Sequence, residues 1–359
     1  MMSNTHSGPA ARTTAGSLAG RQVVVFGAYG HTGRFVVAEL LRRGATPVLV
    51  GRDAGKLDAA RDLAPGAPVR QAFPDDAASL DQALDGAAAV VNCAGPFLDT
   101  ARPLVDAALR AGIPYLDVGA EQAVTAALFD TYGDRAREVG IAVVPSLAFY
   151  GGLGDLLATA ALGDWPDADE ITLAYGLDSW HPTQGTRRTG ESNAGRHLTY
   201  TAGKLSPFSY AQDVAPWNFP EPLGKQDTVV FATADQVTLP RHVRTPEVRA
   251  VMNLAPLRDI GAEDTPEPVP VDAEGRSAQS FLVEAVVTRG QETRRAVAGG
   301  RDIYAVTAPL VVEALARLLR GDRAVTGVVA VGEAFDAESF LRALTPDHLT
   351  RLELPAGAS

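Results

Sequence analysis

The chain has 359 residues, of which 46% are hydrophobic, and its formal net charge is −11. This length allows two domains and a sizeable core, and the acidic balance argues against a nucleic-acid partner. The single cysteine, Cys93, excludes an intrachain disulfide and a cysteine-based zinc site, which fits a cytoplasmic protein. No apolar run has the length of a membrane span, so we predict no membrane association. We also predict no metal site. Residues 1–20 lack the apolar core of a signal peptide, and we expect a flexible tail there.

A glycine-rich turn follows the first apolar run, Val23 to Phe26, which is typical of a strand buried on both faces. The spacing G-x-x-G-x-x-G allows a tight turn, close approach of a ligand to the backbone and close helix–strand contact. The N–H groups that begin the next helix favour a pyrophosphate. Such turns also occur without a ligand, so the residues at the end of the next strand are needed to show whether this turn binds a dinucleotide. The predicted dinucleotide contacts here are Gly27, Tyr29, Gly30, His31, Thr32 and Gly33.

The second strand, Thr46–Gly51, ends where the adenosine ribose of a dinucleotide is expected. NAD-binding proteins usually place a carboxylate there, whereas an arginine accommodates the 2′-phosphate of NADP. Arg52 occupies the place in this chain, and Lys56 follows one helical turn later. Asp53 has two interpretations, because it can cap the next helix or select NAD. We predict that the site prefers NADP(H).

Strands and helices continue to alternate as far as residue 144. The predicted strands are 68–72, 88–92, 113–117 and 141–144, and the predicted helices are 56–63, 76–84, 100–110 and 122–139. This alternation implies an α/β fold with a doubly wound parallel sheet of the Rossmann type, which binds ligands beyond the carboxyl ends of its strands. Further cofactor contacts are predicted at Asp75, Asn92, Ala94, Gly95 and Gly119, although Asp75 is at least as well explained as a helix cap.

The pattern changes after Gly151-Gly152, where a helix at 153–162 leads into a succession of β-type segments. These are predicted at 171–175, 196–201, 228–230, 237–239 and 281–287, with loops or hairpin tips at 207–222 and 261–274. Successive β segments without regular helices indicate an inserted α+β substrate domain built on a mainly antiparallel sheet.

The last part of the chain contains an amphipathic helix at 304–319, residues 325–331 and a short helix at 337–344. We expect it to return to the nucleotide-binding domain and tie the two halves together. The predicted divisions are a tail (1–20), a Rossmann domain (21–150), a substrate domain (151–302) and a C-terminal helical segment (303–359).

Together these motifs resemble the saccharopine dehydrogenase-like family, which includes the trans-acting enoyl reductases. GAYGHTGR is similar to that family's GATGxTGR opening, VGRD with Lys56-Leu57 to its second-strand end, NCAGPF to its fourth and PYLDVGAE to its fifth. The GGxGD and GRDIYAVTAPLVVEA stretches are also similar. The resemblance covers most of 22–344, densely at the nucleotide end and thinly across 165–280. It implies a Rossmann-type domain with an inserted α+β domain, NADP(H) and hydride chemistry. The turn SLAFYGG and the pocket stretch depart from the family pattern, and the substrate is therefore open.

Reduction by hydride transfer usually needs a proton donor for the atom beside the reduced carbon. His181 and Tyr150 are the leading candidates, although His181 is better explained as a loop residue before Pro182. Arg187 and Arg188 can hold a substrate carboxylate or phosphate, or can be a solvated pair. Gly151 and Gly152 complete the predicted substrate contacts.

Three other features receive structural interpretations. The Tyr200-x-x-x-Lys204 spacing matches the acid pair of short-chain dehydrogenases, but it falls on a predicted strand and turn rather than a helix, so we interpret it as coincidence. Cys93 is interpreted as a small buried residue rather than a nucleophile. Asp117 and Glu121 are expected to orient the loop after the fifth strand or to cap a helix.

Two functions remain from the sequence. The first is an NADPH-dependent oxidoreductase that reduces a C=C or C=N bond of a small substrate, carrier-derived or from secondary metabolism. The second is a non-catalytic NADP(H)-binding regulator that recruits a protein. The polar second domain favours the enzyme, and the lack of a well-formed acid pair favours the regulator. If a homodimer forms, we expect it to use the second domain.

Overall fold

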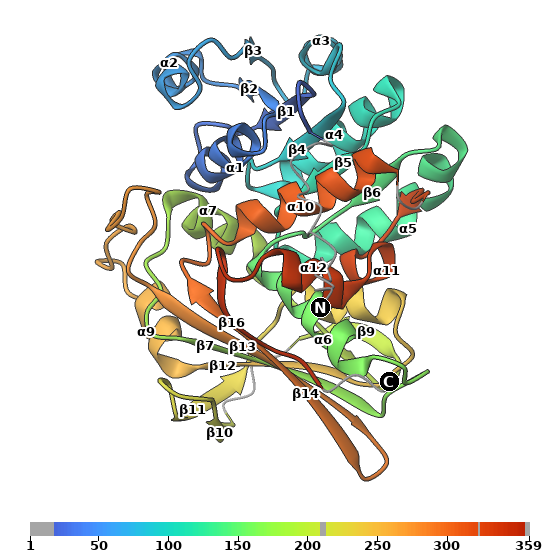
Figure 1. Cartoon of the computed structure of the whole chain (residues 1–359), viewed down its shortest axis with the longest axis vertical. Coiled ribbons are helices and arrows are strands. Elements are labelled where there is room, and N and C mark those ends of the chain that lie inside the picture. Colours follow the sequence, from blue (N-terminus) through green and yellow to red (C-terminus); the bar gives the residue numbers. More distant parts are fainter. Residues whose placement is uncertain (1–17, 209–212, 322–323, 356–359) are drawn as a thin grey trace, which may run out of the picture.

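The computed structural model describes residues 18–208, 213–321 and 324–355, and within these ranges the chain forms two sheets joined by helices (Figure 1). The expected N-terminal tail lies outside the described residues as far as residue 17, and 209–212 of the expected loop 207–222 also lie outside them. Leu18 is fully buried and the N–H of Gly20 donates to Gly44, so the packed fold begins before residue 20.

The first sheet confirms the predicted doubly wound parallel fold. In the described part of the chain it has seven strands in the order β15-β6-β5-β4-β1-β2-β3, and all neighbours are parallel. Its strands are β1 (Gln22–Phe26), β2 (Thr46–Gly51), β3 (Val69–Gln71), β4 (Ala89–Asn92), β5 (Tyr115–Asp117), β6 (Ala142–Val144) and β15 (Gly327–Val328). The connecting helices are α1 (His31–Arg42), α2 (Ala54–Ala59), the 3-10 turn η2 (Ala60–Leu63), α3 (Ala77–Leu84), α4 (Phe97–Ala111) and α5 (Gln122–Val139).

The second sheet is mixed, as its main path β10-β11-β12-β7-β13-β14-β16 contains one parallel pair, β12 with β7. The hairpin of β8 and β9 joins it through β12. The strands are β7 (Glu170–Leu177), β8 (Leu198–Thr201), β9 (Lys204–Pro207), β10 (Ala215–Asn218), β11 (Lys225–Val230), β12 (Val248–Asn253), β13 (Ser280–Arg289), β14 (Glu292–Arg301) and β16 (Leu349–Glu353). Tyr200 and Lys204 lie on the two strands of the β8–β9 hairpin, which agrees with reading their spacing as coincidence.

Helices fill the space between the two sheets (Figure 1). The helix α6 (Gly154–Leu162) packs on β13 and β14, and α10 (Thr307–Arg320) packs on α1 and β5. One apolar core cluster runs through all of these elements, including Val25 of the first sheet, Leu156 of α6 and Val283 of the second. The remaining elements are η3 (Phe149–Leu153), α7 (Gln184–Asn193), α8 (Asp235–Thr238), η4 (Leu239–Arg241), α9 (Leu254–Gly261), α11 (Val331–Ala334) and α12 (Ala337–Ala343). In the described ranges, no helix is long and apolar enough to span a bilayer.

Several local expectations for the second domain were wrong. The predicted strand 237–239 is helical, because it continues α8 into η4 in a wholly buried setting that outweighs the β propensity of Val237 and Thr238. The helix α7, residues 184–193, was not predicted. It has no buried residue and hence no apolar stripe to reveal it, and its start is set by Thr183, whose hydroxyl accepts from the N–H of Thr186. The strands β12 and β14 were not predicted.

The end of the chain contacts both sheets. The strand β15 extends the first sheet by pairing with β6, while β16 pairs with β14 in the second. The described residues that follow α10 therefore add one strand to each sheet, β15 to the first and β16 to the second. These two pairings make the two sheets parts of one packed unit.

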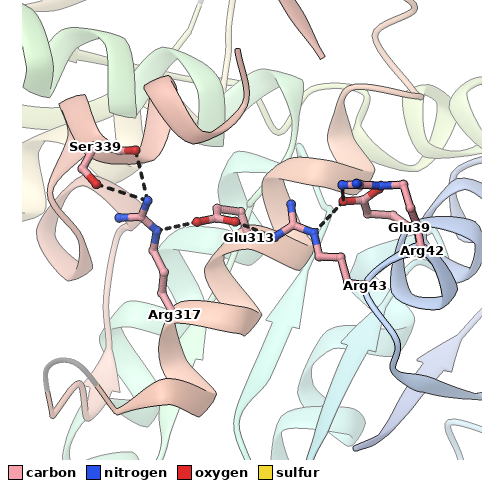
Figure 2. Close-up of polar contacts among 6 residues, drawn as sticks. All are labelled: Glu39, Arg42, Arg43, Glu313, Arg317 and Ser339. Carbon is pink, nitrogen blue, oxygen red and sulfur yellow. Dashed lines mark hydrogen bonds and ion pairs between the residues drawn. The ribbon is translucent and has the colours of Figure 1, made fainter. Parts of the chain in front are cut away.

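A buried ion network fastens α1 to α10 (Figure 2). Glu313 of α10 accepts from Arg43 Nη1 at 2.5 Å and from Arg317 Nε at 2.8 Å, and Arg43 Nε reaches Glu39 at 2.6 Å. The side chains of Glu39, Arg43 and Glu313 are each less than 10% exposed. Since α1 follows directly on the glycine turn, a network that holds the end of α1 against α10 also limits movement of that turn.

Candidate active site at the carboxyl ends of the first sheet

The glycine turn after β1 is shaped by contacts that exclude side chains. Gly27 has φ +86°, and a Cβ there would lie 2.9 Å from Ala94 Cβ. A Cβ on Gly33 would lie 2.2 Å from the carbonyl oxygen of Gly27, so α1 can pack this closely only on glycine. Gly30 differs, because its Cβ would meet only that carbonyl oxygen at 3.1 Å and Cys93 O at 4.0 Å. Packing thus explains the outer glycines, and the open side of Gly30 is the space a pyrophosphate needs.

The helix α1 begins next to this space. Its N-cap is Gly30, without a side-chain capping bond, and its first turn carries no acidic residue. The first N–H groups and the positive end of the helix dipole are thereby left for an anion. His31 lies edge-on to Phe35 and Tyr304, with ring centroids 5.3 and 5.1 Å away. Its Nε2 is buried with no hydrogen-bond partner among the described residues, and burial lowers the pKa of the imidazole.

At the end of β2 the two interpretations of Asp53 are resolved, because its carboxylate accepts from the N–H of Lys56 at 3.0 Å and caps α2. Arg52 is exposed, and its carbonyl is held by Gln71 Nε2 at 2.9 Å. The ring of Tyr29 lies against Gly51, where a Cβ would be 2.5 Å from it, and Lys56 Nζ lies 5.9 Å from the ring centroid. Two cations therefore flank this strand end. Asp75 is exposed, and the side chain that caps α3 is Asp76.

The loop after β4 is held from inside by Asn92. Its fully buried amide donates to Thr100 Oγ1 at 3.1 Å and to Tyr115 at 3.2 Å, while its oxygen accepts from Ala94 N at 3.1 Å. The side chain of Asn92 thus shapes the loop. Burial and the nearby Asp117 raise the pKa of the Cys93 thiol far above its ordinary value, which keeps it protonated and unreactive.

Asp117 has the expected role of orienting the loop after β5, whereas the carboxylate of Glu121 bonds to the first residue of α4. Asp117 accepts from Tyr115 Oη at 2.9 Å, Gly119 N at 2.9 Å and Ser146 N at 2.8 Å, so it joins the ends of β5 and β6. Both Glu121 oxygens accept from the N–H of Phe97, at 3.0 and 2.9 Å. Burial raises the pKa of Glu121 to about 7. Gly119 lies between these carboxylates, with Phe97 3.1 Å from where its Cβ would be.

The segment after β6 carries Tyr150 into a cluster of aromatic rings. The Tyr150 centroid lies 5.0 Å from Tyr175, 5.7 Å from Trp180 and 5.9 Å from Phe231. Its hydroxyl is buried with no hydrogen-bond partner in the part of the chain described, and burial raises its pKa well above the ordinary value. Gly151 (φ +99°) is needed for the turn itself, as its Cβ would meet Ser146 O at 2.7 Å.

The structure places the three predicted site residues His181, Arg187 and Arg188 in different environments. His181 contributes its carbonyl, which accepts from Tyr304 Oη at 3.4 Å. Arg187 donates to the carbonyls of Ala262 and Thr265 at 3.2 and 3.0 Å, which anchors α7 to the loop after α9. Arg188 is exposed. The helix α7 also reaches the first sheet, since Thr189 Oγ1 lies 2.7 Å from where a Gly95 Cβ would be.

Sequence reasoning missed three polar side chains that converge on this region. The hydroxyl of Tyr304 bonds to Trp180 Nε1 at 3.1 Å and Thr186 Oγ1 at 2.9 Å, and its ring contacts His31. Tyr175 Oη donates to Asp235 at 2.6 Å. The GRDIYAV stretch was a usable signal for Tyr304, whereas nothing local marked Asp235. No cluster of three or more His, Cys, Asp or Glu side chains suited to a metal occurs within the described residues.

Asp235 offers a pH test of this description. It is fully buried, and burial raises the pKa of its carboxyl from 3.8 to about 6. A raised pKa stabilises the folded state below the ordinary value, and this stability is lost as pH rises through the folded value. We expect wild-type stability to fall by about 2–3 kcal/mol more than that of Asp235→Asn between about pH 4 and pH 7. Urea unfolding at both pH values measures this. The exposed Asp264→Asn serves as control, and equal slopes for wild type and Asp235→Asn would contradict the expectation.

The sequence of this chain is similar to that of known proteins. Residues 23–144 match the family model for the saccharopine dehydrogenase NADP binding domain. The chain is 32% identical over 142 residues to a probable mitochondrial saccharopine dehydrogenase-like oxidoreductase of Arabidopsis thaliana, covering 35% of this chain and 31% of that protein. It is 29% identical over 134 residues to a trans-acting enoyl reductase of Mycobacterium ulcerans, covering 36% of this chain and 32% of the relative.

A solved structure extends the likeness in fold across both domains. Saccharopine dehydrogenase (L-Glu forming) from Saccharomyces cerevisiae aligns with a TM-score of 0.66 and 13% identity, covering 94% of this chain and 100% of that chain. At this identity the match concerns the fold alone. In sequence, the alignments span about a third of the length of the two relatives named above.

Proposed function

Because residues 23–144 belong to the saccharopine dehydrogenase NADP-binding domain family, we propose that the whole chain is an NADPH-dependent oxidoreductase that reduces a C=C or C=N bond of a small substrate. The observation that carries the proposal is a continuous set of contacts from the glycine turn to the second domain: the ring of His31 packs on Tyr304, the Tyr304 hydroxyl accepts from Trp180 Nε1, and Trp180 packs on Tyr150. The cofactor site and the polar groups of the second domain then belong to one site.

The residues present fit an NADP(H) molecule. The open side of Gly30 and the start of α1 would hold the pyrophosphate, and Arg52 with Lys56 would hold the 2′-phosphate. His31 Nε2, which is buried and unpartnered among the described residues, would gain a partner. When bound, NADPH supplies a hydride to the substrate carbon, so the protein must supply one proton to the adjacent atom.

The 2′-phosphate assignment can be tested by selectivity. A charge-assisted contact contributes about 1.5–3 kcal/mol, so NADPH should bind at least about tenfold more tightly than NADH. Arg52→Ala should remove most of this preference, whereas Arg61→Ala, at a surface pair with Asp58, should leave it intact. Calorimetric titration of each variant with NADPH and with NADH measures this preference. Equal dissociation constants in the unmutated protein would overturn the assignment.

Tyr150 and His181 remain the two candidates for the proton donor. The Tyr150 hydroxyl lies among the second-domain aromatics with no hydrogen-bond partner among the described residues, so it is free to donate to a substrate, which supports its role. Tyr150→Phe keeps the ring and removes the proton, so turnover should fall by at least about a hundredfold while NADPH affinity changes little. His181→Ala is measured alongside. A larger loss of turnover in His181→Ala than in Tyr150→Phe would move the role to His181.

The activity itself is tested by NADPH oxidation with a panel of enoyl and imine substrates. We expect at least one substrate to be reduced by the wild-type chain and not by Gly30→Val. Tight NADPH binding without oxidation of any panel member would favour the alternative, a non-catalytic NADP(H)-binding regulator. The assignments of a homodimer through the second domain and of a cytoplasmic location also stay predictions.

A further inference from the structure

The starting point is the buried pair of Tyr175 and Asp235, in the second domain. Tyr175 Oη donates to Asp235 Oδ2 at 2.6 Å, and both residues are fully buried. The other carboxylate oxygen, Oδ1, makes no well-aligned hydrogen bond among the described residues, although the nearby Thr233 hydroxyl, itself without a partner there, acts to lower the pKa of the carboxyl. A buried carboxylate oxygen is costly without a partner, so such a group usually has a role or an ordered water beside it.

The unpartnered oxygen lies at the start of α8, which ends one turn later at Thr238. Thr238 Oγ1 is also buried and unpartnered within the described ranges. The 3-10 turn η4 follows, and His242 ends it with a backbone outside the helical region (φ −135°, ψ −14°). The helix α6 packs on both α8 and η4, so the polar groups of these turns face the same helix.

Directly after η4, His242 is paired with a carboxylate of α6. His242 Nε2 lies 3.1 and 3.3 Å from the two oxygens of Asp155, which also accepts from Gly332 N at 2.9 Å. The side chain of His242 is 9% exposed and that of Asp155 is fully buried. Asp155 raises the pKa of the imidazole against the effect of burial.

Gly154 lets the two polar pairs approach each other. A Cβ on this residue would lie 2.4 Å from both Asp235 Oδ1 and Tyr175 Oη, so only glycine fits beside them. The next residue along α6 is Asp155, whose charge acts on both Asp235 and Tyr175. Gly154 therefore contacts the Tyr175–Asp235 pair, and the adjacent Asp155 contacts His242.

We propose that Asp235, Thr238 and His242, the last held by Asp155, form a proton path that connects the Tyr150–Tyr175 pair with solvent and replaces the proton consumed in each reduction. The path requires water between Asp235 Oδ1 and Thr238 and between Tyr175 and the hydroxyl of Tyr150. The catalytic half of this proposal rests on the proposed function, and the path itself does not.

Each step of the path moves one proton. The Tyr150 hydroxyl gives its proton to the substrate atom beside the reduced carbon, and the phenolate takes one from Tyr175 through water. Tyr175 is reprotonated by the Asp235 carboxyl across their 2.6 Å bond. Asp235 then takes a proton from the His242 imidazolium through water and Thr238, and His242 takes one from solvent. One solvent proton is consumed per turnover, and every group returns to its starting state.

Charged and titratable groups face Asp235 from several elements. They are Tyr175 on β7, Tyr150 on η3 and Asp155 on α6, while Glu333 of α11 acts on His242. Removing the positive charge of His242 leaves Asp155 without its counter-charge. The negative field at Asp235 then grows, and Asp235 should hold its proton to a higher pH.

The first test needs no substrate. Infrared titration of the full chain, with and without NADP⁺, follows the protonated carboxyl band that disappears in Asp235→Asn. We expect this band at about pH 5 and not at about pH 8, and a higher midpoint in His242→Gln but not in the control His348→Gln. Titration of Asp235 at an ordinary carboxyl pH, or the same midpoint in His242→Gln, would overturn the path whatever the activity.

The second test uses a substrate from the enoyl and imine panel. His242→Ala should lower kcat about tenfold in dilute buffer with KM unchanged, and imidazole should restore it in proportion to the concentration of its protonated form. If the substitution lowered kcat only by disturbing the structure, kcat would not rise with the concentration of imidazolium. A kcat within twofold of wild type would overturn the path. If the Asp235 midpoint depends on His242 but no panel member is reduced by NADPH, the proposed reductase function is wrong and the proton path is retained.

Discussion

Substituting Gly30 with valine is expected to abolish NADPH binding while the chain remains folded. The backbone of Gly30 is extended (φ −69°, ψ 162°), which valine adopts without strain, and its Cβ would meet only the Gly27 carbonyl oxygen closely. The side chain would occupy the space that the pyrophosphate needs. Losing two charge-assisted hydrogen bonds of about 1.5–3 kcal/mol each weakens binding by at least about a hundredfold.

Two further glycine variants make this result specific. Gly261→Val, at the end of α9 with no atom within 4 Å of its Cβ, should bind NADPH normally. Gly33→Ala should lose stability as well as binding, because its Cβ would lie 2.2 Å from Gly27 O. Calorimetric titration and circular dichroism measure both properties. A folded Gly30→Val that binds NADPH with wild-type affinity would place the phosphate site elsewhere.

Glu313→Gln is expected to cost the fold about 3–5 kcal/mol, the range found when one partner of a buried ion pair is removed. Glu313 is buried and accepts from Arg43 and Arg317, so the amide leaves two guanidinium groups with less compensation (Figure 2). The change should appear in the urea midpoint. It should also weaken NADPH binding to a smaller extent, since α1 carries the glycine turn.

The matched control for Glu313 lies on α12. Glu338 pairs with Arg342 at the surface, where both side chains are more than half exposed. Surface pairs contribute below about 1 kcal/mol, so Glu338→Gln should change stability little. Equal losses for the two variants would show that the buried network does not hold α1 to α10.

The nucleotide-binding domain could be predicted from sequence because its strands are continuous apolar runs that end at glycines. The strand Thr46–Gly51 and the helix Gln122–Val139 were predicted with the bounds that the structure shows. The second domain gave weaker signals. The helix α7 has no buried face, and α8 is a four-residue turn whose β-branched residues are buried from all sides. Local propensity cannot reveal an element that only tertiary contacts hold.

The candidate site followed the same division. The glycine turn and Arg52 were evident because their chemistry is written in a short contiguous motif. Tyr175, Asp235 and Tyr304 come from three distant parts of the chain, and only the folded sheets bring them near Tyr150. Asp53 shows a further limit, since a carboxylate beside Arg52 had two interpretations until its hydrogen bond to Lys56 N decided between them.

The proposed hydride transfer to a small substrate is measured most directly with NADPH that is deuterated at the reactive nicotinamide carbon. The chain is incubated with this cofactor and the enoyl and imine panel, and the products are analysed by mass spectrometry. We expect one deuterium on carbon in the product of an accepted substrate and none with Gly30→Val. Panel-wide absence of deuterated product, under conditions in which NADPH saturates the chain, would contradict it.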